Sequence, residues 1–355
     1  MPVSTLAGAL GACRGVRMPK RNALDRIPVA VAGLGQIGRE VARAVLARPE
    51  LELVGALETD PALIGGQLSR LLDLSLGPAD LRIAGEEAAV FERAGEGVLL
   101  QLTGSRLPAV LGQIERALKS GLNVISSCEE LAFPWLRHAE LADKLEDLAR
   151  RAKRSVLGTG INPGFVLDRL VCTLGAAVGH IQKVHAERVV DAGTRRAALR
   201  RKLGAGLTRE QWDQQVDEGQ VGHVGLSESA ALISAGLGLD CEEFDETIDP
   251  VIAQERLTGP ALEDTIERDH VAGCRQVARG FSDGREVIQL ALTLAVGAKD
   301  PHDEVHLFGQ PEIHMISPGG IAGDRATAWT MVNSIPALVT AEPGLLTVLD
   351  LPAGR

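Results

Sequence analysis

The sequence predicts an α/β fold, in which a doubly wound parallel sheet is joined to a second, α+β domain with a mixed or antiparallel sheet. Over residues 27–158, short apolar segments alternate with amphipathic segments of helical length, a pattern typical of β-α-β units. From about residue 180 onward, long apolar runs follow one another without helices between them. An Asp-Gly pair at residues 283–284 separates two of these runs, which indicates an antiparallel hairpin.

The composition agrees with a globular protein of two domains. The 355 residues are enough for two cores, and a hydrophobic content of 45% excludes a disordered chain. The net charge of −10 argues against nucleic acid as a partner, because binding of the phosphate backbone needs basic stripes. No apolar run approaches the roughly 20 residues that span a bilayer, so no membrane contact is expected. Five cysteines without a CxxC pair fit free thiols and a cytoplasmic location.

The first half of the chain contains the elements of the parallel sheet. Strands are predicted at Ile27–Ala32, Leu51–Leu57, Val98–Leu102, Leu122–Ser127 and Ser155–Leu157, and helices over residues 39–47, 107–119 and 134–153. A further helix is expected to begin at Asp60-Pro61, because an aspartate cap followed by a proline favours a helix start.

The second half contains longer strands. They are predicted over residues 181–190, 271–281, 286–296 and 304–316, with helices over 207–218, 226–236 and 322–340. We therefore expect a flexible extension of residues 1–26, a first domain of residues 27–158, and a substrate and oligomerisation domain of residues 159–321. Residues 322–345 are expected to pack back on the first domain.

The segment GLGQIG at residues 33–38 is a GxGxxG motif in the context of a dinucleotide-binding Rossmann domain, with a strand before it and a helix after it. Gly33 suits a tight turn, Gly35 lets a pyrophosphate approach the backbone, and Gly38 lets the helix pack on the strand. An acid at the end of the second strand, Glu58, would accept hydrogen bonds from the adenosine ribose. The cofactor is therefore NAD or NADP, and NAD is slightly favoured.

A second loop, Thr103-Gly104-Ser105, ends the next core strand, where the nicotinamide half would lie. The other interpretation is an ordinary loop with a capping serine. The expected cofactor-binding residues are Gly33, Gly35, Gln36, Ile37, Gly38, Glu58, Thr103, Gly104 and Ser105.

Two adjacent acids, Glu129 and Glu130, follow another predicted strand and are candidates for general acid or base work. Because adjacent side chains usually point apart, at most one is expected to be catalytic. Their neighbour Cys128 is expected to be a buried structural cysteine.

The segment GTGINPGFVLD at residues 158–168 is expected to form a wall of the active site. Its three glycines permit close approach of the backbone, and Pro163 suits the first turn of a helix. Asn162 would then cap that helix or face a ligand.

Two more residues are candidates for substrate binding. Arg188 would either fork onto a substrate carboxylate or form a structural salt bridge. His223 lies near a predicted helix start, where a histidine is more often a cap or a core hydrogen-bonding group. His302 and His306 are four residues apart in a stretch that reads as turn and strand, and no cluster has metal-ligand spacing, so no metal is predicted.

In order, the motifs GLGQIG, LTGS, CEEL, GTGINPGFVLD, ERVVDAGTRR with KLGAGLT, and GHVGLSES resemble those of the 2,4-diaminopentanoate dehydrogenase family. They are also similar to those of the related native amine dehydrogenases, within the dihydrodipicolinate reductase-like superfamily. The resemblance covers roughly residues 27–340. GTGINPGF and GHVGLSES are its most specific motifs, whereas GxGxxG is common.

The resemblance implies NAD(P)-dependent, reversible oxidative deamination of an amine or amino acid to a ketone and ammonia, by hydride transfer through an imine. It implies that Glu129 or Glu130 transfers protons and that Asn162 and Arg188 line the substrate pocket. A homodimer is expected, since dimers are common in this fold. Val189 and Val190 stand where the family often has Gln or Asn, which favours a less polar amine.

Two alternatives stay open. One is a carbonyl or cyclic-imine reductase of the same superfamily, which would turn over without ammonia. The other is a non-catalytic dinucleotide-binding sensor, which would be unaffected by replacement of Glu129 or Glu130.

Overall fold

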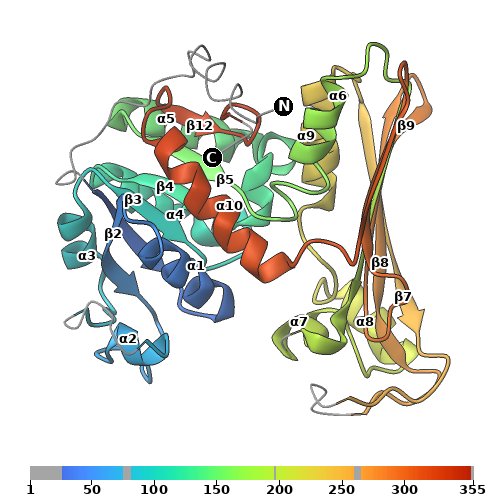
Figure 1. Cartoon of the computed structure of the whole chain (residues 1–355), viewed down its shortest axis with the longest axis horizontal. Helices are drawn as coiled ribbons and strands as arrows, with labels where there is room; N and C mark the ends of the chain where they lie inside the picture. Colours follow the sequence, from blue (N-terminus) through green and yellow to red (C-terminus); the bar gives the residue numbers. More distant parts are fainter. Residues whose placement is uncertain (1–25, 75–80, 196, 260–264, 353–355) are drawn as a thin grey trace, which may run out of the picture.

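The computed structural model describes residues 26–74, 81–195, 197–259 and 265–352, which form two six-stranded sheets (Figure 1). The expected extension of residues 1–26 lies outside the described residues except for Arg26. The predicted fold class is confirmed, since a parallel sheet is joined to a mixed one.

The first sheet is parallel and has the strand order β12-β5-β4-β3-β1-β2. Its strands are β1 (Ile27–Ala32), β2 (Leu51–Leu57), β3 (Val98–Gln101), β4 (Asn123–Ser126), β5 (Ser155–Gly158) and β12 (Gly344–Leu346). The strands β3, β4 and β5 are fully buried, as expected for a parallel sheet covered on both faces.

Helices cover both faces of this sheet. They are α1 (Gln36–Leu46), α2 (Leu68–Leu71), α3 (Glu87–Ala94), α4 (Leu107–Lys119), the 3-10 helix η1 (Glu129–Ala132), α5 (Trp135–Ala152) and α10 (Gly323–Leu338). The apolar side chains of α1 and α10 form one core with the sheet, and those of α3, α4 and α5 form another. Both α10 and β12 come from the C-terminal part of the chain, so the polypeptide returns to the first sheet after it has completed the second (Figure 1).

The second sheet is mixed and has the order β11-β10-β6-β9-β8-β7. Its strands are β6 (Lys183–Asp191), β7 (Glu243–Ile252), β8 (Val271–Ser282), β9 (Arg285–Ala295), β10 (His302–Phe308) and β11 (Ile313–Pro318). The pair β6 and β9 is parallel, and the other neighbours are antiparallel.

Five short helical segments accompany this sheet. They are α6 (Arg169–Gly175), the 3-10 helix η2 (Ala192–Thr194), α7 (Ala197–Lys202), α8 (Arg209–Asp217) and α9 (Leu226–Leu237). Figure 1 shows α6 and α9 between the two sheets. Along β6, buried residues alternate with half-buried ones, so one face of the sheet packs on the helices and the other carries more exposed side chains.

Two predictions about elements were wrong, and some elements were not predicted. No helix begins at Asp60-Pro61, because the Asp60 carboxylate accepts a hydrogen bond from the Ala62 backbone N–H and closes a turn, and the next helix starts at Leu68. The run over residues 304–316 is two antiparallel strands, since the chain reverses at residues 309–312. The strand β7 was missed, because its alternating acids made the segment read as polar.

Candidate active site

The glycine-rich turn between β1 and α1 has space for a bound group at one glycine and is closed at another. A Cβ atom on Gly35 would meet no atom within 4 Å, whereas one on Gly38 would lie 1.9 Å from the carbonyl oxygen of Gly33. A phosphate can therefore approach the backbone at Gly35, beside the free N–H groups at the start of α1. At Gly38 the glycine is required for packing. The turn fits the diphosphate of a dinucleotide.

Glu58 is fixed directly beside this turn. Its carboxylate accepts hydrogen bonds from the backbone N–H groups of Leu34 and Thr59, each at 2.7 Å. Burial raises the pKa of this carboxyl, but the hydrogen bonds from Leu34, Thr59 and Asp60 outweigh it and hold the pKa below its usual value. An ionised acceptor therefore stands at the end of β2, where a dinucleotide would place its adenosine ribose.

A cavity of about 420 Å³ extends from the glycine-rich turn to the second sheet. The first domain contributes residues that follow β1, β3, β4 and β5, so the cavity lies at the carboxyl ends of the parallel strands, where open α/β sheets bind ligands. The second domain contributes side chains of β6, β9 and the α7 region, and α10 contributes three residues.

Most of the residues predicted from the sequence line this cavity. They are Gly35, Gln36, Ile37, Gly38, Thr103, Gly104, Ser105, Glu129, Asn162, Arg188 and His223. Three others, Gly33, Glu58 and Glu130, do not line it.

The two adjacent acids have different surroundings. Glu129 lines the cavity together with Ser127 and Asn162. The Glu130 side chain is 3% exposed and accepts hydrogen bonds from the Leu107 backbone N–H at 2.7 Å and from His138 Nε2 at 2.9 Å. Glu130 thus holds the loop before α4 in place, and Glu129 is the acid that faces the cavity.

The turn at Asn162 differs from the prediction. Pro163 does not begin a helix: the Asn162–Pro163 peptide is cis, and α6 begins six residues later at Arg169. The helix is capped by Asp168, whose carboxylate also accepts hydrogen bonds from the Gly164 backbone N–H at 2.7 Å and from Ser229 Oγ at 2.9 Å. The turn is therefore fastened to α9 through one buried carboxylate.

Asn162 is not a helix cap but a buried amide in the cavity wall. The residue is 9% exposed, and within the part of the chain that the structure describes neither its amide nitrogen nor its oxygen has a hydrogen-bond partner. A buried amide without partners costs about 1–3 kcal/mol. A polar ligand in the cavity would offset this cost.

Arg188 lines the cavity, but its guanidinium is engaged within the chain. It donates hydrogen bonds to Asp303 Oδ1 and to the Ile321 carbonyl oxygen, both at 2.6 Å. The Asp303 carboxylate also accepts the Ile321 backbone N–H at 2.7 Å. This buried ion pair fixes the segment that leads into α10, which corresponds to the salt-bridge interpretation of Arg188.

His223 is positioned through its backbone. Its N–H donates to Gln276 Oε1 at 2.6 Å, and Gln276 Nε2 donates to its carbonyl oxygen at 3.0 Å. The segment before α9 is thereby tied to β8, and the His223 side chain lies at the cavity wall.

Cys128 is 1% exposed, and burial raises the pKa of its thiol to about 12. It is therefore a poor nucleophile at neutral pH. This agrees with its interpretation as a structural cysteine.

Among the cavity residues that were not found from the sequence, two lie on a distant helix. Asp324 and Thr327 lie on α10, more than 150 residues along the chain from the Asn162 turn, and Thr327 Oγ1 accepts the Ile161 backbone N–H at 3.3 Å. No local motif marks them, because only the return of the chain to the first sheet brings them to the site.

None of the helices in the described ranges is long and apolar enough to cross a membrane.

The C-terminal half of the chain matches the model of a known family. Residues 165–355 match the model of the 2,4-diaminopentanoate dehydrogenase C-terminal domain. The match covers more than half of the chain, including α10 and β12.

Known proteins are similar over nearly the whole chain. A 2,4-diaminopentanoate dehydrogenase of Acetoanaerobium sticklandii is 29% identical over 338 residues, 94% of this chain and 95% of the relative. An amine dehydrogenase of Streptomyces virginiae is 24% identical over 357 residues, 92% of this chain and 96% of the relative. The structure of an amine dehydrogenase from Mycobacterium smegmatis has the same fold, with a TM-score of 0.84 at 22% identity over 94% of this chain and 98% of that one.

Proposed function

The chain belongs to the 2,4-diaminopentanoate dehydrogenase family, and on this premise we propose that it is an NAD(P)-dependent amine dehydrogenase that converts an amine or amino acid to a ketone and ammonia. The observation that carries the proposal is the shared cavity. An acid, Glu129, and an amide without partners, Asn162, lie in the same cavity as the glycine-rich turn. The membership also confirms the resemblance inferred from the sequence motifs.

A nicotinamide dinucleotide, when bound, supplies the hydride acceptor for oxidation of the amine and the hydride donor for the reverse reaction. The chain would hold its diphosphate at Gly35 and at the N–H groups of Gln36 and Ile37. Thr103, Gly104 and Ser105 line the same cavity and would lie beside the nicotinamide half.

Glu58 supports NAD as the preferred cofactor. Its ionised carboxylate can accept hydrogen bonds from ribose hydroxyls and would repel a ribose phosphate. The test is the ratio of kcat/KM with NAD to that with NADP, which should fall at least about tenfold in Glu58→Gln, a change of about 1.4 kcal/mol.

Glu129 would act as the general base. In the direction of deamination it accepts a proton from the substrate ammonium, so that the nitrogen lone pair can form the C=N bond as the hydride leaves the carbon. After this proton has passed to solvent, the ionised Glu129 takes a proton from the water that attacks the imine carbon. Glu129 then gives that proton to the nitrogen of the carbinolamine and accepts the hydroxyl proton as the C–N bond breaks, which releases ammonia and the ketone.

Asn162 would orient the reacting group. Its amide oxygen can accept a hydrogen bond from the substrate nitrogen, and its NH₂ group can donate one to the oxygen of the carbinolamine or ketone. Satisfying both atoms at once requires a polar substrate group close to Glu129.

The second-domain side of the cavity is mixed in polarity. Val190, Leu199 and Leu294 are apolar, whereas Arg195 and Lys202 carry positive charge. Because Arg188 is engaged with Asp303, a substrate carboxylate would depend on Arg195 or Lys202. We therefore propose an amine with an apolar part, with or without a carboxylate at its far end.

The test is NADH oxidation with small ketones and with 2-amino-4-oxopentanoate, in concentrated ammonium at mildly alkaline pH. Ammonia-dependent turnover is expected for at least one ketone of the panel. Reduction that proceeds equally without ammonium would favour a carbonyl or cyclic-imine reductase, and tight NADH binding without turnover would favour a sensor.

A further inference from the structure

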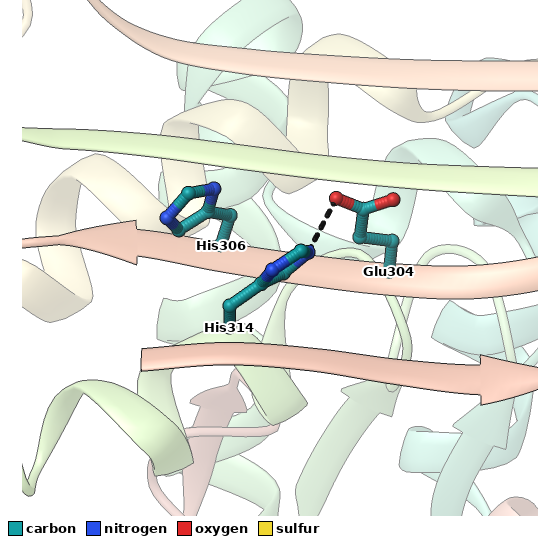
Figure 2. A group of neighbouring side chains, drawn as sticks. All are labelled: Glu304, His306 and His314. Carbon is teal, nitrogen blue, oxygen red and sulfur yellow. Dashed lines mark hydrogen bonds and ion pairs between the residues drawn. The ribbon is translucent and has the colours of Figure 1, made fainter. Parts of the chain in front are cut away.

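Three potential metal ligands meet on the more exposed face of the second sheet, away from the active site. Figure 2 shows Glu304 and His306 on β10 and His314 on β11, with their side chains on the same face of the two strands. A nitrogen or carboxylate oxygen from each residue lies within 4.8 Å of those from the other two.

The hairpin geometry explains why they meet. Glu304 and His306 are two residues apart in one strand and therefore share a face. His306 pairs directly with His314 in the antiparallel register of β10 and β11. Side chains at directly opposed positions of two such strands lie next to each other.

The contacts within the group already bring donor atoms together. His314 Nε2 lies 2.8 Å from Glu304 Oε1, and the rings of His306 and His314 stack with their centroids 4.5 Å apart and an angle of 19° between planes. His306 Nε2 also lies 2.5 Å from Glu312 Oε1.

The surroundings are acidic. Glu187 on β6 and His302 on β10 form a second group with Glu304, in which the potential ligand atoms also lie within 4.8 Å of one another. Glu187, Glu304 and Glu312 place three carboxylates around the two stacked imidazoles, which favours a divalent cation at this surface.

We propose that Glu304, His306 and His314 bind a divalent transition metal, for which Zn²⁺ is the reference ion. Two imidazoles and one carboxylate are a common donor set for zinc, with a fourth position open to water. Mg²⁺ and Ca²⁺ prefer oxygen ligands and should bind weakly or not at all.

Completing the site requires rotation of the two imidazoles. Two nitrogen ligands on one zinc ion lie about 3.4 Å apart for bonds near 2.1 Å, and the potential ligand atoms of this group lie within 4.8 Å of one another. The His306 ring stacks on those of Phe308 and His314, so both imidazoles must turn out of the stack to direct a nitrogen at one ion. The side chains of His306 and His314 are 18% and 45% exposed, so this rotation takes place at the surface of the sheet.

The metal would link the edge strand of the sheet to its neighbour. In the described sheet β11 is the edge strand and pairs only with β10, which carries Glu304 and His306. A metal held by both strands binds the folded chain in preference to the unfolded one, and so raises the temperature of unfolding.

The experiment is calorimetric titration of the full chain, freed of metal by a chelator, with Zn²⁺ and in parallel with Mg²⁺. Saturable binding of one Zn²⁺ per chain is expected, with an increase in Tm that Mg²⁺ does not produce. Each of the variants Glu304→Gln, His306→Gln and His314→Gln should weaken Zn²⁺ binding by at least about tenfold.

The matched control is His270→Gln, which removes a half-buried histidine just before β8, outside the group. It should bind Zn²⁺ like the parent chain. None of the four residues lines the active-site cavity, so dehydrogenase turnover should be unchanged in all four variants. Normal turnover therefore serves as the control that each variant has folded.

Three results would overturn the proposal. They are a dissociation constant for Zn²⁺ weaker than ~100 µM in the parent chain, unchanged binding in the three ligand variants, and a loss in His270→Gln as large as theirs. If one ligand variant does not fold, the other two still decide the question.

Discussion

The carboxylate of Glu130 accepts a hydrogen bond from the backbone N–H of Leu107 at 2.7 Å, and this contact gives Glu130 a structural role that its neighbour Glu129 does not share. Through it, Glu130 joins the turn η1 to the first residue of α4. Its neighbour Glu129 is left on the side of the cavity. Replacing the two acids in parallel therefore tests the assignment of the general base.

In Glu129→Gln, we expect kcat for amine oxidation to fall by about 10²–10⁴-fold with a nearly unchanged Tm, because a general base is lost while the size and shape of the side chain are kept. In Glu130→Gln, we expect a lower stability by about 1.5–3 kcal/mol, because charge-assisted hydrogen bonds are replaced by neutral ones. Steady-state kinetics and urea unfolding of both variants measure the difference. The opposite pattern would assign catalysis to Glu130.

Asn162→Leu should separate stability from activity. Leucine has a similar volume and no polar atoms, so the buried amide without partners is removed, and the free energy of unfolding should stay equal or rise by up to about 1–3 kcal/mol. At the same time kcat/KM should fall at least about tenfold, the equivalent of one hydrogen bond to the substrate.

Thermal unfolding and kinetics of Asn162→Leu, beside Asn162→Ala as a cavity-forming control, provide the measurement. A leucine variant with normal kcat/KM would contradict the proposed role of the amide.

The two glycines of the turn should respond differently to the same change. Gly35→Ala adds a methyl group in open space, so the fold should be nearly unaffected while NADH binding weakens by about tenfold or more. Gly38→Ala places the methyl group against the carbonyl oxygen of Gly33 and should destabilise the chain by about 1–3 kcal/mol. NADH titration by fluorescence and denaturant unfolding distinguish them. Unchanged NADH binding in Gly35→Ala would argue against a bound diphosphate at Gly35.

Glu58 should contribute stability that depends on pH. Its pKa is lower in the folded chain than the usual value of 4.5, so the folded state favours the ionised form. The contribution is present above pH 4.5 and is lost as the pH falls towards the folded pKa. The difference in unfolding free energy between the parent chain and Glu58→Gln should thus be largest near neutrality and shrink below pH 4.5. Urea unfolding of the parent chain and of Glu58→Gln between pH 7 and pH 3 measures this difference.

Five strands of the first sheet and the glycine-rich turn could be predicted because their signals are local, whereas the short strand β12 was not predicted. Apolar runs such as Ile27–Ala32 end at turn residues, and the period of the pattern changes where the helix α1 begins. In the second sheet, β7 has a regular alternation, but its alternate side chains are acids such as Glu243 and Asp245. The signal of a strand was therefore obscured by a composition typical of loops.

The site was predictable only where its residues follow strand ends. The prediction identified Asn162 as a site residue but wrongly placed a helix start beside it. The helix α6 begins after Asp168, whose carboxylate caps it and is held by Ser229, 61 residues further along the chain. Likewise, the sequence spacing of His306 and His314 does not match a metal-binding motif. The two residues become neighbours only because the turn at residues 309–312 pairs the two strands.

The return of α10 and β12 to the first sheet has a consequence for protein engineering. A fragment that stops at Gly158 would lack β12, the neighbour of β5. It would also lack α10, so the apolar side chains of α1 that share a core with Met331 and Ile335 would be exposed. The cofactor half therefore cannot be obtained by truncation at one point. A chimera that exchanges the second sheet between relatives must be spliced twice, once after β5 and once before α10, and both junctions border the cavity in which the new substrate would bind.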